Sequence, residues 1–134
     1  MSRLLGIDYG DTRIGIAASD PLKIISKPIT TLVNNDDFLT NLEKIINDKD
    51  VEAIIVGYPI GMKGQRTPQT EKVDDFVDIL KNKFDLDVIT VDERLSSISA
   101  TNSLVKQGIK TGHNKGMIDD TSAAIILQEY LDGR

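Results

Sequence analysis

Residues 4–19 read LLGIDYGDTRIGIAAS, and this stretch decides the fold that the sequence predicts. It holds two short apolar runs, at residues 4–9 and 13–19, which are of typical strand length. Gly10-Asp11-Thr12 between them is rich in turn-forming residues. The stretch therefore predicts a β-hairpin with two antiparallel strands.

The rest of the chain alternates between strand and helix patterns. A third extended run, at residues 24–33, contains Pro28, which favours a position near the edge of a sheet. Asn34 and Asn35 are candidate caps for a helix that follows them. We further expect a strand at 53–56 that stops at Gly57, a helix from Thr70, a strand at 88–91, a helix from Ser96 or Ser97 to near Gly108, and a last helix over about 118–131.

This order of elements predicts a mixed α/β sheet with helices on its faces. The opening hairpin implies antiparallel pairing, whereas strands that alternate with helices imply parallel pairing through right-handed crossovers. The chain has 134 residues, no internal repeat and no linker. We therefore expect a single domain over residues 1–134.

The composition excludes several classes of protein. Hydrophobic residues make up 40% of the chain, which is typical of a soluble globular protein. A net charge of −5 excludes a histone-like protein that coats nucleic acid by bulk positive charge. The longest clean apolar runs, such as 123–127, are far shorter than the ~20 residues of a membrane helix, so we expect a cytoplasmic protein without membrane contact.

Acidic residues lie where the predicted parallel strands end. Asp8 ends the first strand and Asp92-Glu93 ends the fifth, and ligands of open α/β sheets gather at this edge. Asp8 follows residues that look like core, where a carboxylate without a partner is rare. An equally weighted alternative is that Asp8 caps the turn at Gly10 through an Asx-type hydrogen bond.

The last predicted helix supplies a third acidic position. Ala123 and Ile126 lie four and seven residues beyond Asp119, so Asp119 shares a helix face with small apolar residues. One of Asp119 and Asp120 could instead simply complement the helix dipole. Converging carboxylates need cations, and because the chain has no Cys and one His, Mg²⁺ or Mn²⁺ fits. Two such ions would activate a water molecule and stabilise the leaving oxygen of a phosphodiester.

Four motifs in order now resemble one known family over essentially the whole chain. They are GIDYGDTRIGIA at 6–17, VGYP at 56–59 with Gly64, DERLSS at 92–97, and Ile118-Asp119 leading to ILQ at 126–128 with Tyr130-Leu131. Together they resemble the YqgF/RuvX family, described both as Holliday junction resolvases and as nucleases that process precursor small-subunit ribosomal RNA. The resemblance implies an RNase H-like fold with a mixed five-stranded sheet flanked by helices.

The resemblance also implies a site and an activity. It implies a Mg²⁺- or Mn²⁺-dependent nuclease whose catalytic and metal-binding residues are Asp8, Glu93 and Asp119. Its substrates would be the 5′ end of pre-16S rRNA, Holliday junctions, or both. Ser122 departs from the family pattern, so the choice between Asp119 and Asp120 stays open. Tyr58 is a second departure from the pattern. A fourth acidic residue is not evident.

Basic residues gather in the loops beside these acids. Residues 94–117 and 57–70 contain no acidic residue, and contacts of Lys and Arg with phosphate supply most sequence-independent affinity for nucleic acid. Scattered solvated lysines are the plainer interpretation. The residues expected to contact nucleic acid are Arg13, Lys63, Arg66, Arg94, Lys110 and Lys115.

Two functions other than a nuclease are also considered from the sequence. DYGDT also resembles the phosphate loop of actin-like ATPases, but those proteins close two domains over the nucleotide and 134 residues are too few for both. A binding module that sits on RNA or a ribosome-assembly partner without cutting it is the other alternative. We expect a monomer or a homodimer, since symmetric cleavage of a junction requires a two-fold dimer.

Overall fold

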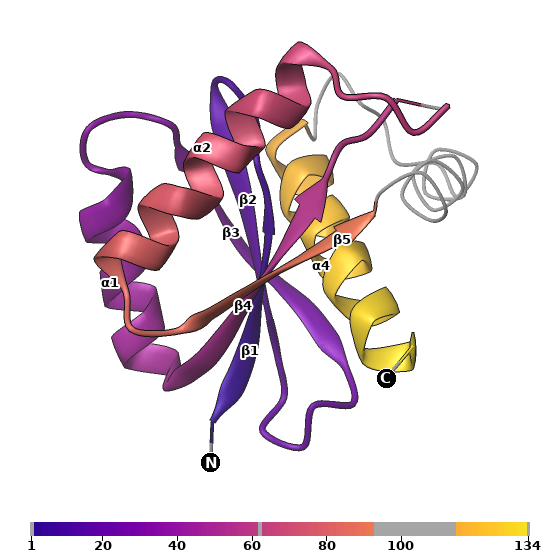
Figure 1. The fold of residues 1–134 in the computed structure, drawn as a ribbon. Helices are drawn as coiled ribbons and strands as arrows, with labels where there is room; N and C mark the ends of the chain where they lie inside the picture. Colours follow the sequence, from indigo (N-terminus) through magenta and orange to yellow (C-terminus); the bar gives the residue numbers. More distant parts are fainter. Residues whose placement is uncertain (1, 62, 93–114, 134) are drawn as a thin grey trace.

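The strands form one mixed sheet in the order β3-β2-β1-β4-β5 (Figure 1). A computed structural model describes residues 2–61, 63–92 and 115–133. The five strands are β1 (Arg3–Asp8), β2 (Arg13–Ser19), β3 (Ser26–Val33), β4 (Val51–Tyr58) and β5 (Asp87–Asp92).

Strand pairing confirms the predicted mixture. β1 pairs with β2, and β2 with β3, in antiparallel fashion, whereas β1 with β4 and β4 with β5 are parallel. Ile7 lies opposite Ile16 on one side and opposite Val56 on the other. Pro28 lies in β3, at an edge of this sheet, because proline cannot donate a hydrogen bond to a second neighbour.

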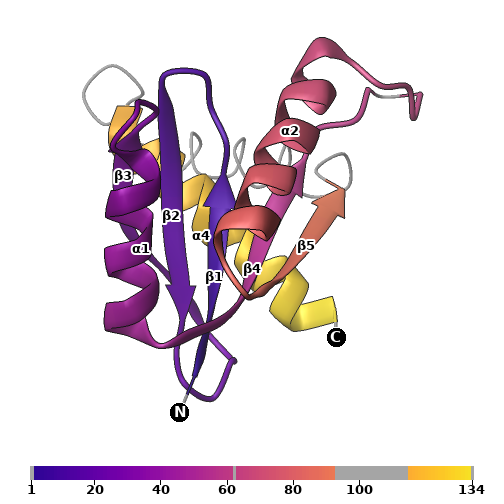
Figure 2. The same cartoon turned by 60° about the vertical axis from the view of Figure 1, so that its left-hand side comes forward.

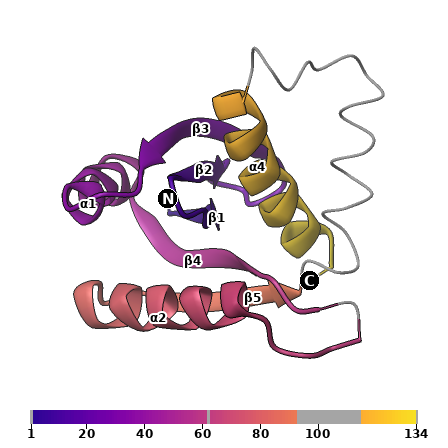
Figure 3. The same cartoon turned by 90° about the horizontal axis from the view of Figure 1, so that it is seen from above.

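Helices cover the two faces of the sheet. α1 (Phe38–Lys49) and α2 (Pro68–Lys83) pack on one face, and α4 (Lys115–Gly133) packs on the other (Figures 2 and 3). The alternation of strand residues decides which side chains go where. Leu5, Ile7, Ile54 and Val56 face α1 and α2, while Leu4, Ala53 and Ile55 pack against Ile126, Leu127 and Leu131 of α4.

Most predicted elements are confirmed, several with other bounds: β3 begins at Ser26 rather than residue 24. β4 begins at Val51 and continues to Tyr58, one residue past the expected stop at Gly57. The helix expected from Thr70 is α2, whose apolar residues Val73, Val77 and Leu80 are buried. α2 begins at Pro68 rather than Thr70 because Thr67 and Thr70 form a reciprocal capping box.

The predicted caps of α1 are wrong. Asp37 is the N-cap, and it makes no side-chain capping bond. Asn35 lies two residues earlier, and its Oδ1 accepts a hydrogen bond from the Asp37 amide at 3.0 Å. Asn34 instead supports the β1–β2 turn, since its Nδ2 donates to the Gly10 carbonyl at 2.9 Å. The helix expected between Ser96 or Ser97 and Gly108 lies outside the described residues.

No helix in the part of the chain that the structure describes is both long and apolar enough to cross a bilayer.

Candidate active site

Three parallel strands end at one edge of the sheet, and the beginning of a helix lies there too. β1, β4 and β5 run in the same direction and end at Asp8, Tyr58 and Asp92. Helix α4 crosses the sheet with its N-terminal end toward this edge (Figures 1 and 2). We call this the carboxyl edge. It is the edge at which the sequence predicts the site.

Asp8 lies on the face of the sheet that α4 covers. Leu4 packs against α4, and a Cβ atom added at Gly6 would lie 2.7 Å from Leu127 Cβ and 2.8 Å from the Ala123 carbonyl oxygen. Asp8 is two residues beyond Gly6, and alternate strand residues share a face. It is half-buried, in contrast to the fully buried Ile7 before it.

The backbone of α4 brings Asp119 to the same region. Ala123 lies over Gly6, and Asp119 is one turn earlier on the same helix face, about 6 Å along the axis. Asp8 lies about 6.6 Å beyond Gly6 along β1, toward the same edge. Both displacements run from the contact at Gly6 toward the carboxyl edge. Asp120, the next residue, is rotated by about 100° around the helix.

The third expected ligand, Glu93, lies outside the described residues. It follows Asp92, the last residue of β5, directly in the sequence. Ile89 and Val91 of β5 pack on the α4 side. Among the side chains that are described, no three acidic or histidine groups lie close enough to hold a metal ion.

The turn before β2 fixes the backbone next to Asp8. The Asn34 amide donates to the Thr12 carbonyl at 2.9 Å, and Lys72 Nζ lies 3.1 Å from Asp11 Oδ1. A Cβ atom at Gly10 would lie 2.4 Å from the Arg13 carbonyl oxygen, so only glycine fits there. Arg13, half-buried, therefore starts β2 close to the end of β1.

A cluster of polar side chains closes the end of β4. The Tyr58 hydroxyl donates to Asp74 Oδ1 at 2.8 Å, and Arg66 donates to the Tyr58 oxygen at 3.0 Å and forms an ion pair with Asp74. The Arg66 guanidinium, followed by the Tyr58 hydroxyl, lowers the pKa of Asp74. Asp74 in turn raises the pKa of Arg66. We call Tyr58, Arg66 and Asp74 the β4–α2 bridge, because it ties the loop after β4 to helix α2.

The expected nucleic-acid contacts are distributed unevenly. Lys63 and Arg66 are exposed in the loop after β4, although Arg66 is committed to the β4–α2 bridge. Lys115 is the first residue of α4. Arg94 and Lys110 lie outside the described residues. Sequence reasoning missed Asp74 as the partner of Arg66, because the two are eight residues apart and lie on different elements.

Solved structures with this fold define the class of protein. *Thermus thermophilus* RuvC in complex with a Holliday junction aligns with a TM-score of 0.59 at 13% identity, covering 100% of this chain and 96% of that chain. The fowlpox virus resolvase in complex with junction DNA aligns with a TM-score of 0.54 at 10% identity, covering 98% of this chain and 97% of that one. The fold is therefore that of the RNase H-like resolvases, as expected.

The sequence comparisons show the particular family. The family model described as "RuvX: Holliday junction resolvase" matches residues 2–133, and the chain belongs to this family. A *Ruminiclostridium cellulolyticum* protein named "Putative pre-16S rRNA nuclease" is 40% identical over 97% of this chain and 94% of its own length. A protein of the same name from *Amoebophilus asiaticus* is 41% identical over 98% of this chain and 94% of its own length. Family membership places the chain among nucleic-acid-binding hydrolases that act on phosphodiester bonds.

Proposed function

We propose that the chain is a divalent-metal-dependent nuclease that processes the 5′ end of pre-16S rRNA, with Asp8, Glu93 and Asp119 as its catalytic carboxylates. The observation that supports this proposal is the close approach of α4 to β1 at Gly6, because Asp8 follows Gly6 on the same strand face and Asp119 precedes Ala123 by one helical turn. The proposal treats residues 1–134 as one catalytic domain.

The residues at the carboxyl edge fit a hard cation. Asp8 is a half-buried carboxylate at the end of an apolar strand, and burial of several carboxylates together is costly unless a cation neutralises them. All three proposed ligands offer oxygen, which Mg²⁺ and Mn²⁺ prefer. When bound, such an ion lowers the pKa of water and stabilises negative charge on a phosphodiester. Asp8, Glu93 and Asp119 would hold the ions.

Basic residues near this edge would orient the substrate. Arg13 starts β2 two residues before Gly15, which lies opposite Asp8, and Lys63 is exposed in the loop after β4. In the proposal these two residues, with Arg66, Arg94, Lys110 and Lys115, bind backbone phosphates without distinguishing bases. Arg66 would do so while it is held by Asp74.

The ribosomal precursor is the first choice of substrate because the relatives near 40% identity carry that name over nearly their whole length. Cleavage of Holliday junctions is the second candidate. The description of the family model and the similarity in fold to RuvC bound to a junction favour it. Symmetric cleavage of a junction would require two copies of the chain.

The test compares Asp8→Asn with Asp11→Asn, a matched change in an exposed carboxylate three residues away. Purified proteins are given a precursor 16S rRNA fragment and a four-way DNA junction, with Mg²⁺, with Mn²⁺ and with EDTA. We expect metal-dependent cleavage of the RNA, a loss of at least about a hundredfold in Asp8→Asn, and little change in Asp11→Asn.

Each outcome has a defined meaning. Full cleavage by Asp8→Asn would remove Asp8 from the mechanism and with it the proposed site. Cleavage of the junction alone would favour the second candidate. Binding without cleavage of either substrate in the wild type would favour the non-catalytic binding module.

A further inference from the structure

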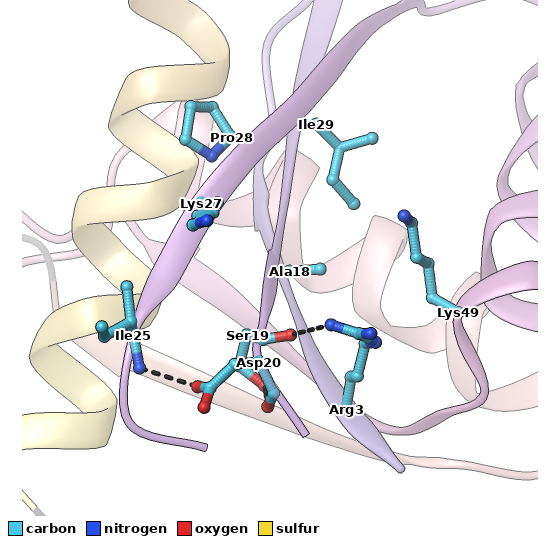
Figure 4. Close-up of a pocket in the computed structure, with 9 residues that line it drawn as sticks. All are labelled: Arg3, Ala18, Ser19, Asp20, Ile25, Lys27, Pro28, Ile29 and Lys49. Atoms are coloured by element: carbon cyan, nitrogen blue, oxygen red, sulfur yellow. Dashed lines mark hydrogen bonds between the residues drawn. The ribbon is translucent and has the colours of Figure 1, made fainter. Parts of the chain in front are cut away.

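A recess lies at the opposite end of the sheet from Asp8, and Figure 4 shows the residues that line it. It has a volume of about 380 Å³ and lies among the start of β1, the end of β2, the start of β3 and the end of α1. Arg3 begins β1 and Asp8 ends it, so the recess is about 17 Å from the carboxyl edge along the strand. Arg3 also has the parity of Leu5 and Ile7, which face α1 and α2 rather than α4. We call this recess the basal pocket.

Three cationic side chains line the basal pocket: Arg3, Lys27 and Lys49. Arg3 is positioned by a hydrogen bond from Nη1 to the Ser19 carbonyl oxygen at 3.2 Å (Figure 4). Within the described chain, neither Lys27 nor Lys49 forms an ion pair with a carboxylate. Three positive charges in one lining are a locally basic cluster in a chain whose net charge is −5.

The lining includes one carboxylate, Asp20, and it is already used by the backbone. Its Oδ1 accepts hydrogen bonds from the Ile24 and Ile25 amides at 2.7 and 2.8 Å (Figure 4). These bonds, that from Ile25 first, lower the pKa of Asp20 and keep the group ionised. Asp20 therefore holds the β2–β3 loop in place and offsets only part of the positive charge.

The other part of the lining is apolar. Ala18 and Ile29 lie on the same side of β3 as Arg3 and Lys49, next to the core of the α1 face (Figure 4). Ile25 and Pro28 also belong to the lining, but their side chains project from the other side of β3, toward α4 (Figure 4). Charge on one side and apolar surface on the other is a combination that small-ligand pockets use, and the volume lies in their usual range of roughly 300–1,000 Å³.

We propose that the basal pocket binds a nucleotide unit, with its phosphate against Arg3, Lys27 and Lys49 and its sugar and base against the apolar side that Ala18 and Ile29 form. The unit could belong to a polynucleotide or be a free mononucleotide, because both present the same phosphate and ring. If the unit belongs to a polynucleotide, this proposal rests on the proposed function, and the pocket holds a part of the substrate away from the cleavage site. If the unit is a free mononucleotide, its binding is independent of cleavage.

The test compares the double variant Lys27→Gln/Lys49→Gln with Lys44→Gln/Lys81→Gln, which removes the same charge from exposed lysines outside the pocket. Binding of a fluorescent precursor-rRNA hairpin is measured by anisotropy in EDTA, between about 50 and 200 mM salt. If the pocket holds RNA, the pocket variant binds at least about tenfold more weakly at the lower salt, and the slope of log K against log salt falls by about 0.7–0.9 per lysine.

A second experiment tests whether the pocket binds a free mononucleotide. AMP and inorganic phosphate are titrated into ¹⁵N-labelled wild type and both double variants, and the amide signals of Ala18, Ser19 and Ile29 are followed. Saturable shifts with AMP in the wild type and the control variant, but not in the pocket variant, support a mononucleotide even if RNA binding is unchanged. If both double variants bind RNA equally and AMP moves none of these signals, the proposal is wrong. Because no step requires cleavage, Asp8→Asn can lose activity, or keep it, without altering this result.

Discussion

At Gly6, helix α4 lies directly on β1. A Cβ atom there would come within 2.7 Å of Leu127 Cβ and 2.8 Å of the Ala123 carbonyl oxygen, and the second contact is with backbone that cannot rotate away. Any larger side chain therefore has to push α4 off the sheet. Because Gly6 lies two residues before Asp8 and under the helix that carries Asp119, this glycine matters for stability and, in the proposal, for the site.

Gly6→Ala should lower the free energy of unfolding by about 1–3 kcal/mol, the usual cost of adding a methyl group to a well-packed core. Urea denaturation followed by circular dichroism measures this. Gly133→Ala is the matched control, because a Cβ atom there meets nothing within 4 Å. Equal stability of Gly6→Ala and wild type would show that α4 does not pack as closely as described.

At the scale of elements, the β4–α2 bridge joins the end of a strand, the loop after it and the helix that follows. Tyr58 is half-buried and packs against the core of the α1 and α2 face, with its hydroxyl bonded to Asp74. Its ring is therefore part of the protein's own packing rather than a free stacking surface for a base. The loop itself is further ordered by hydrogen bonds between Gly61 and Gln65.

The bridge should make part of the stability depend on acid pH. The folded-state pKa of Asp74 is lowered, chiefly by Arg66, so its contribution is present above the unfolded-state value of about 3.9 and is lost as pH falls through the folded-state pKa. Asp74→Asn should therefore be less stable than wild type at neutral pH, and this difference should shrink in acid. Asp75→Asn, on the exposed side of α2, is the control. A difference that stays constant from neutral to acid pH would contradict the role of the charge.

The elements also show what sequence patterns can and cannot predict. Periodicity reports which residues are buried, so the hairpin, helix α2 and the alternation of strands and helices along the chain were predictable. The caps of α1 were not, because Asn34 and Asn35 bond to a turn and to a loop amide instead of the helix. Periodicity does not identify the partner across space, so neither the pairing of Arg66 with Asp74 nor the approach of α4 to Gly6 could be derived. The roles of Asp8, Glu93 and Asp119 stay predictions.

At the scale of the whole molecule, metal binding and folding should be linked. If Asp8, Glu93 and Asp119 form the proposed site, their carboxylates repel one another when no cation is present, whereas an unfolded chain keeps them apart. A ligand that binds only the folded state stabilises it, by about 1.4 kcal/mol when its concentration is ten times its Kd.

Mg²⁺ or Mn²⁺ should therefore raise the melting temperature of the wild type, and EDTA should reverse the rise. Asp8→Asn should show a much smaller rise, while its melting temperature without metal should equal or exceed that of the wild type because one repelling charge is gone. Differential scanning fluorimetry with Asp11→Asn as control measures both. A rise of the same size in Asp8→Asn would place the ion elsewhere.

The position of α4 in the chain has a consequence for synthesis. All five strands precede this helix in the sequence, yet it covers Leu4, Gly6, Ala53 and Ile55 near the middle of the sheet. During translation the sheet's central strands are thus made well before their cover, and their apolar face stays open until the helix emerges. The proposed carboxylate set is likewise incomplete until that moment, so a nascent chain would not cut nucleic acid before α4 has been made.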